Sequence, residues 1–236
     1  MNDGIFLTFD MDGAPDYMLE AVLVPLYKKK IPATVFATGL SDLLMTCPDG
    51  VEIGLHPYIK KLDSFPNAIK KLKEIYPDAR CLRSHGLVSS SALLIHCWRW
   101  GLKVTSNYLM LDAPPKGALP MLYGIHEYPI CFMDDIVLLE GVSINAMQIA
   151  MEKTGLRVLT FHPVHIYLNA CSFHQYLSVK GRLYDKKFVD THVQNKRLGI
   201  RDLFISLLES PATKDQFLLF PESVETPTKL PEGYPA

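Results

Sequence analysis

The chain has 236 residues, of which 48% are hydrophobic and 21% are charged, a composition that is ordinary for a soluble globular enzyme. Its 24 Lys and Arg nearly balance 25 Asp and Glu, and the net charge of −1 gives no electrostatic reason to expect a nucleic acid or an anionic membrane as partner. No apolar run approaches the ~18–20 residues of a membrane span, no signal peptide is recognisable, and the 5 scattered cysteines fit reduced thiols, so we expect a cytoplasmic protein.

The first predicted element is a buried parallel strand over residues 4–10. Its apolar run, rich in β-branched and aromatic residues, leads directly into Asp10-Met11-Asp12-Gly13. The glycine predicts a turn, so Asp10 and Asp12 should lie at the carboxyl end of the strand. Alternation along an extended backbone would place both carboxylates on the same side.

Further strands and helices alternate along the chain. The predicted strands are 32–39, 51–57, 79–86, 103–109, 128–133 and 156–163, with a possible edge strand at 217–220. The predicted helices are 16–30, 64–76, 89–100, 143–153 and 199–208. Residues 110–127 are expected to be a loop, 168–195 a polar excursion, and the tail from 221 poorly ordered.

This alternation predicts parallel βα units within a single domain spanning residues 1–236. About seven core strands suit either a barrel or a doubly wound sheet. Polar residues recur at the strand ends, and in a barrel these ends would meet at one mouth. They are Asp10, Asp12, His56, Arg83, His85, Asp134, Asp135 and His162.

Carboxylates and imidazoles at one mouth suit a divalent transition metal, because both are normal zinc ligands. Such a site also needs a base and an acid, and the sequence offers candidates for both. Composition and spacing alone do not assign these roles.

The order of the motifs resembles the polysaccharide deacetylase family, also called carbohydrate esterase family 4 or the NodB homology domain. Four stretches carry the resemblance: Thr8-Phe9-Asp10-Met11-Asp12-Gly13, Glu52-Ile53-Gly54-Leu55-His56, Leu82-Arg83-Ser84-His85-Gly86 and Leu159-Thr160-Phe161-His162-Pro163. The resemblance implies a distorted (β/α)7 barrel, similar to a TIM barrel. It also implies hydrolysis of an N-acyl amide, acetyl or formyl, on an amino sugar.

Carried over residue by residue, the resemblance makes Asp10 the general base, oriented by Arg83, and His162 the general acid. Asp12 and His56 become ligands of one divalent metal, zinc in the first place, with cobalt or nickel as alternatives. The family's second metal histidine falls on Lys60 here, so we expect His85 to replace it as the third ligand.

The motifs around His56, His85 and His162 are similar to a WbmS-like branch linked to O-antigen loci, which implies a nucleotide-linked, lipid-linked or glycan-linked amino sugar as substrate. Asp135 and His165 are weaker candidates for substrate binding. Asp134 and Asp135 could also orient a histidine or cap the next element. Two other functions stay open: a sugar-binding pseudoenzyme on the same barrel, favoured by Lys60, and an amidohydrolase for a small amide that is not a sugar.

Overall fold

The computed structural model describes residues 4–46, 49–59, 64–111, 117–141, 155–213 and 215–221, and its strands form one curled sheet in the order β6-β7-β5-β4-β3-β2-β1-β9-β8. All pairings are parallel except that of β6 with β7. The strands are β1 (Gly4–Asp10), β2 (Ala33–Ala37), β3 (Val51–Leu55), β4 (Cys81–Leu82), β5 (Val104–Thr105), β6 (Leu119–Pro120), β7 (His126–Glu127), β8 (Ile130–Met133) and β9 (Leu156–Phe161).

Two hydrogen bonds close this sheet into a barrel. The extended segment after β5 reaches β8, where the Ile130 amide donates to the Tyr108 carbonyl (2.7 Å) and the Met110 amide donates to the Ile130 carbonyl (2.8 Å). Buried Glu127 holds this segment, because its carboxylate accepts from the amides of Asn107 (2.6 Å) and Tyr108 (3.0 Å). The ring of β1, β2, β3, β4, β5, β8 and β9 is the expected distorted (β/α)7 barrel, and the prediction of fold class is confirmed.

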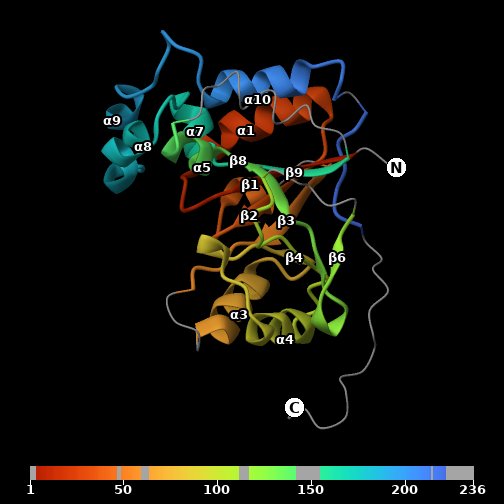
Figure 1. Cartoon of the computed structure of the whole chain (residues 1–236). Coiled ribbons are helices and arrows are strands. Elements are labelled where there is room, and N and C mark those ends of the chain that lie inside the picture. The colour runs from red at the N-terminus through yellow and green to blue at the C-terminus, as the bar shows by residue number, and fades with distance from the viewer. Residues whose placement is uncertain are drawn as a thin grey trace.

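Helices cover the outside of this barrel. In Figure 1, α1 and α10 lie together on one side of the sheet, whereas α3 and α4 lie on the opposite side. The helices are α1 (Asp16–Lys29), α2 (Asp42–Met45), α3 (Phe65–Ile75), α4 (Ser91–Arg99), α5 (Asp134–Leu139), α7 (Pro163–Leu168), α8 (Phe173–Val179), α9 (Lys186–Asp190) and α10 (Ile200–Glu209), with 3-10 turns η2 (His85–Leu87), η3 (Leu122–Gly124) and η4 (Lys180–Arg182).

Strand β1 lies between β2 and β9 in the sheet, and all of its residues are buried. Its odd-numbered residues, Ile5 to Phe9, pack in the main core, whereas Phe6 packs in a second cluster together with Phe36 and Phe220. Phe6 stacks on Phe220, with ring centroids 4.8 Å apart. This alternation sends Asp10 to the same side of β1 as Phe6, toward the barrel interior.

Several connections differ from the sequence-based expectation. The predicted strand 217–220 is wrong: Phe217 makes only an isolated bridge to Ile5, because Phe220 turns into the aromatic cluster instead of pairing. The predicted loop 110–127 contains β6, η3 and β7, and the excursion at 168–195 contains α8, η4 and α9. The predicted helix 143–153 and nearly all of the tail from 221 lie outside the described residues.

Two expectations from composition can be checked on the part of the chain that is described. The four cysteines found there are free thiols, and three of them, Cys81, Cys97 and Cys131, are buried. Among the described helices, none combines the length and the apolar character needed to cross a membrane.

Candidate active site

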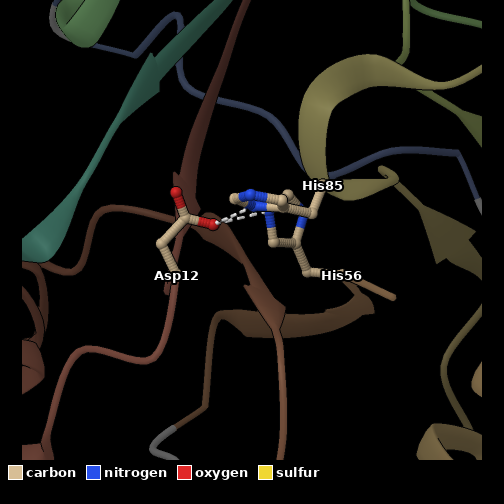
Figure 2. Close-up of side chains that lie close together, drawn as sticks. All are labelled: Asp12, His56 and His85. Atoms are coloured by element: carbon tan, nitrogen blue, oxygen red, sulfur yellow. Dashed lines mark hydrogen bonds and ion pairs between the residues drawn. The ribbon is translucent and has the colours of Figure 1, made fainter. Parts of the chain in front are cut away.

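Three predicted metal ligands meet at the mouth of the barrel. One carboxylate oxygen of Asp12, Oδ1, lies 2.9 Å from Nε2 of His56 and 2.8 Å from Nδ1 of His85, as Figure 2 shows. His56 follows β3 and His85 begins η2 directly after β4, so the ends of successive strands bring the three together. Their donor atoms all lie within 4.8 Å of one another.

The reason Asp12 reaches this cluster is different from the one we predicted. β1 ends at Asp10, and Asp12 has a left-handed backbone with φ of 46°, followed by Gly13 with φ of 73°. The expectation that alternation along an extended chain places Asp10 and Asp12 on one side is therefore wrong. A tight turn, in conformations that aspartate and glycine tolerate better than most residues, aims the Asp12 carboxylate.

His56 is oriented as a metal ligand would be. Its Nδ1 lies 2.7 Å from the backbone carbonyl of Arg83, which can only accept a hydrogen bond, so Nδ1 carries the proton. In a neutral imidazole the lone pair is then on Nε2, which faces Asp12. A cation between Nε2 and the carboxylate satisfies both groups at once.

The electrostatics of this cluster match that orientation. Burial alone would raise the pKa of Asp12, but hydrogen bonds with His162, His56 and His85 outweigh burial and hold it well below its usual range. The hydrogen bond between His85 and Asp12 raises the pKa of His85. Asp12 is therefore an anion that attracts positive charge.

Asp10 is held by a completely buried arginine. Nη1 of Arg83 donates to Oδ1 of Asp10 (2.8 Å) and to the hydroxyl of Thr8 (3.0 Å). The guanidinium also donates from Nε to the Ser106 carbonyl (3.0 Å) and from Nη2 to the Ser106 hydroxyl (2.8 Å), and it lies 4.4 Å from the Phe36 ring centroid. These contacts fix the position of the Asp10 carboxylate, and within the described residues its Oδ2 accepts no hydrogen bond.

His162, directly after β9, is held by Asp134, the first residue of α5 directly after the neighbouring strand β8. Its Nδ1 donates to Oδ1 of Asp134 (2.6 Å), its backbone amide donates to Oδ2 (2.9 Å), and its Nε2 lies 3.5 Å from Oδ2 of Asp12. Burial alone would lower the pKa of His162, but the Asp134 carboxylate and the hydrogen bonds to Asp12 and Asp134 hold it well above its ordinary value. His162 thus points Nε2, as a proton-bearing nitrogen, at Asp12 in the cluster of candidate metal ligands.

His165 lies on the other side of Asp134. Its Nδ1 is 3.1 Å from Oδ2 of Asp134, but the two are not aligned as a hydrogen bond. His165 is only 1% exposed, and neither ring nitrogen has a hydrogen-bond partner among the described residues. A buried imidazole without hydrogen bonds lowers the stability of the fold unless a bound ligand forms hydrogen bonds with its nitrogens.

These residues line one cavity of about 150 Å³. Asp12, His85, His162, His165 and Asp135 contribute to its wall, and the wall is completed by Val164, Phe173, Tyr176 and Lys180. The carboxylate of Asp135 accepts from the amide of Ile136 (2.7 Å), and burial raises its pKa. Asp10 and Arg83 lie deeper, inside the barrel.

Two groups on the described part of the chain have the composition of a metal site: Asp12 with His56 and His85, and Asp134 with His162 and His165. The first group fits a metal better, because the side chains of Asp12 and His85 are 20% and 36% exposed and leave room for water or substrate. The second is completely buried, and both oxygens of Asp134 already accept hydrogen bonds from His162. Lys60, which stands where the family has its second histidine, lies outside the described residues.

The sequence offered Asp134 and Asp135 as acids that could orient a histidine, and it is Asp134 that contacts His162. Other residues of this site were not singled out from the sequence. Phe173, Tyr176 and Lys180 were not recognised at all, although their spacing of three and four residues is that of one helix face.

The barrel thus carries an aspartate-histidine cluster, an arginine-held aspartate and an aspartate-held histidine at the carboxyl ends of its strands, the arrangement that the sequence resemblance leads us to expect. The chain matches the family described as WbmS-like: Polysaccharide deacetylase over residues 7–180, and it belongs to that family. The resemblance drawn from the sequence motifs is therefore confirmed.

The chain is also similar to solved structures. The chain is similar to a polysaccharide deacetylase assigned to O-antigen biosynthesis in Bordetella bronchiseptica, with 26% identity, a TM-score of 0.79, and coverage of 86% of this chain and 89% of that chain. A family 4 carbohydrate esterase from Streptomyces lividans, in complex with acetate, is 17% identical, with a TM-score of 0.49 and coverage of 69% and 80%. No curated protein matches the chain significantly.

Proposed function

We propose that this chain is a metal-dependent hydrolase that removes an acetyl or formyl group from the nitrogen of an amino sugar. The sugar would belong to a bacterial surface polysaccharide or its precursor, as the role of the Bordetella relative suggests. In this reaction water adds to the amide carbonyl, the C–N bond breaks, and a carboxylic acid and a free amine leave. The observation that carries the proposal is that three supported groups lie at the carboxyl ends of parallel strands: a ligand cluster and a histidine that border one cavity, and an aspartate buried behind it.

Asp12, His56 and His85 would hold one divalent metal, zinc in the first place, with cobalt or nickel as alternatives. When bound, such a metal acts as a Lewis acid on the amide carbonyl and makes water a better nucleophile at neutral pH. The carboxylate of Asp12 supplies the negative charge that holds the cation. The Arg83 carbonyl keeps the His56 ring turned so that Nε2 faces it.

Asp10 is the proposed general base. Arg83 occupies only one oxygen of its carboxylate, so the other oxygen can take a proton from the attacking water. Four hydrogen bonds, two of them to Ser106, fix Arg83 itself, so Asp10 is held in place before the substrate arrives. Arg83 acts through Asp10 and is a positioning residue.

His162 is the proposed general acid. The amine leaves readily only if its nitrogen is protonated as the C–N bond breaks. Asp134 holds the protonated imidazole and directs its Nε2 toward the cavity. The two roles are thus separated: Asp10 accepts a proton deep in the barrel, and His162 donates one at the mouth.

Asp135 and His165 are proposed to bind the sugar. Both line the cavity, and the unpartnered nitrogens of His165 suit a sugar hydroxyl group. The cavity of about 150 Å³ suits one sugar ring better than a long stretch of polymer.

The test is release of acetate from N-acetyl amino sugars by protein stripped of metal and reloaded with zinc, cobalt or nickel. We expect turnover only in the presence of metal, and its loss in Asp12→Asn and His56→Ala together with bound metal. Asp10→Asn should lose turnover but keep the metal. Sugar binding without acetate release by the metal-loaded protein would indicate the sugar-binding pseudoenzyme instead. Acid release from small amides that are not sugars would indicate the alternative amidohydrolase.

A further inference from the structure

One wall of the cavity comes from α8, which the sequence marks only as a polar excursion. Phe173, Tyr176 and Lys180 line the same cavity as Asp12 and His85, and their spacing of three and four residues places them on one helix face. Lys180 continues the helical backbone into η4, with φ of −48° and ψ of −38°. The three side chains therefore form a continuous surface, which we call the α8 wall.

The α8 wall is fixed in place and does not behave as a loose cover. On the opposite face of α8, Val179 is completely buried, and the Gln175 amide group donates to the carbonyls of Leu168 (3.1 Å) and His192 (2.8 Å). Gln175 also accepts from the Cys171 amide (3.1 Å). These bonds present the wall to the cavity in a set orientation, as a preorganised binding surface requires.

Two aromatic rings make the inner part of the α8 wall. The Phe173 and Tyr176 ring centroids lie 5.5 Å apart, and Tyr176 packs edge-on against His165, with centroids 5.2 Å apart and planes at 86°. Tyr176 has no hydrogen bond to its hydroxyl among the described residues. An aromatic surface with a free hydroxyl beside a polar cluster suits a sugar ring, which has an apolar face and polar edges.

Lys180 makes the exposed, outer part of the wall. Its ammonium lies 5.6 Å from the Tyr176 ring centroid, and it forms no ion pair with a carboxylate in the described part of the chain. Two neighbouring basic residues of the same excursion are paired, Arg182 with Asp185 (2.6 Å) and Lys186 with Asp190 (2.8 Å). Lys187 on α9 forms no ion pair among the described residues either, but unlike Lys180 it does not line the cavity. An unpaired cation at the rim of a cavity attracts a negatively charged group of a ligand.

We propose that the α8 wall selects an acidic amino sugar, with its ring on Phe173 and Tyr176 and a carboxylate or phosphate at Lys180. This inference rests on the proposed function, because it assumes that the N-acyl group points to Asp12. The N-acyl group then lies at Asp12 and the negative group at Lys180, on the α8 side of the cavity. Lys180 is thus a residue for substrate selection, not for catalysis.

The test measures equilibrium binding to the zinc-loaded full chain by calorimetry. The three probes are neutral N-acetylglucosamine, N-acetylglucosaminuronic acid, which carries a ring carboxylate, and UDP-N-acetylglucosamine, which carries a diphosphate. We expect at least one acidic probe to bind ten times more tightly than the neutral probe, and the one that does identifies the source of the charge. Lys180→Met should remove this preference, Lys187→Met on exposed α9 should keep it, and Tyr176→Ala should weaken all binding.

Equal binding of the three probes, no binding of any, or equal effects of Lys180→Met and Lys187→Met would overturn the inference. So would unchanged binding by Tyr176→Ala. Binding does not require turnover, so the two proposals fail separately. Acetate release without preference for acidic probes would overturn only the proposal that the α8 wall selects acidic sugars. Preference for acidic probes without acetate release would overturn only the proposed deacetylase activity.

Discussion

Asp134 offers the sharpest prediction about catalysis, because its two oxygens serve one histidine. Oδ1 accepts from Nδ1 of His162 (2.6 Å), and Oδ2 accepts from the His162 backbone amide (2.9 Å). In Asp134→Asn only one of the two atoms can still accept, so one donor of His162 meets an amide NH2 group. The imidazolium also loses the buried charge that stabilises it.

A hydrogen bond to a charged group contributes about 1.5–3 kcal/mol. If His162 needs this interaction to donate its proton, kcat falls about 10- to 150-fold, since 1.36 kcal/mol corresponds to tenfold. KM and bound metal should stay near wild type, because Asp12, His56 and His85 are not altered. The assay is steady-state acetate release, with metal content and urea unfolding measured on the same samples.

Asp202→Asn is the matched control. Asp202 also accepts hydrogen bonds, from the Gly199 amide (3.0 Å) and the Asn169 side chain (2.8 Å), but at the start of α10. This variant should lose stability and keep kcat. A folded, metal-loaded Asp134→Asn with kcat within about twofold of wild type would refute the reasoning, as would an equal loss of kcat in the control.

Three further predictions concern stability in urea unfolding. Gly54→Ala should lower the free energy of unfolding by about 1–3 kcal/mol, because its new Cβ would lie 2.5 Å from a ring carbon of Phe36. The control is Gly39→Ala, whose Cβ would meet nothing within 4 Å, and equal stabilities of the two variants would contradict this prediction. Arg83→Met should cost about 3–5 kcal/mol because it leaves Asp10 buried and unpaired, and a loss below about 1 kcal/mol would show that Asp10 needs no partner. Burial raises the pKa of Glu127, so the folded state holds this proton more tightly, and wild-type stability should fall as the pH rises from about 4.5 through the raised value. The stability of Glu127→Gln relative to wild type should rise over this pH range. A difference in stability that does not change with pH would contradict the prediction.

The strands and the meeting of Asp12, His56 and His85 were predictable for physical reasons. Every residue of β1 is buried, so this strand is a continuous apolar run in the sequence, and the turn after it is marked by glycine. Since parallel strands place their carboxyl ends at one edge, the polar residues that end them were candidates for one site. His85 was chosen because Lys60 stands at the usual ligand position and His85 stands at the next strand end, and the structure brings it beside Asp12.

The choice between Asp134 and Asp135 could not be made from the pattern. The pairing of β8 with β9 shifts register between Ile130 and Phe132, so alternation along β8 does not tell which of the two acids faces His162. The α8 wall was missed for another reason. α8 spans Phe173–Val179 and α9 only Lys186–Asp190, and helices this short carry too few turns for a periodic pattern to stand out from a polar loop.

The central claim is that Asp12, His56 and His85 hold the metal, with His162 beside it as an acid. Anomalous diffraction at the zinc edge from crystals of the zinc-loaded protein tests this directly. We predict one strong peak bounded by Asp12, His56 and His85. A peak among Asp134, His162 and His165, or no peak in either group, would contradict the account.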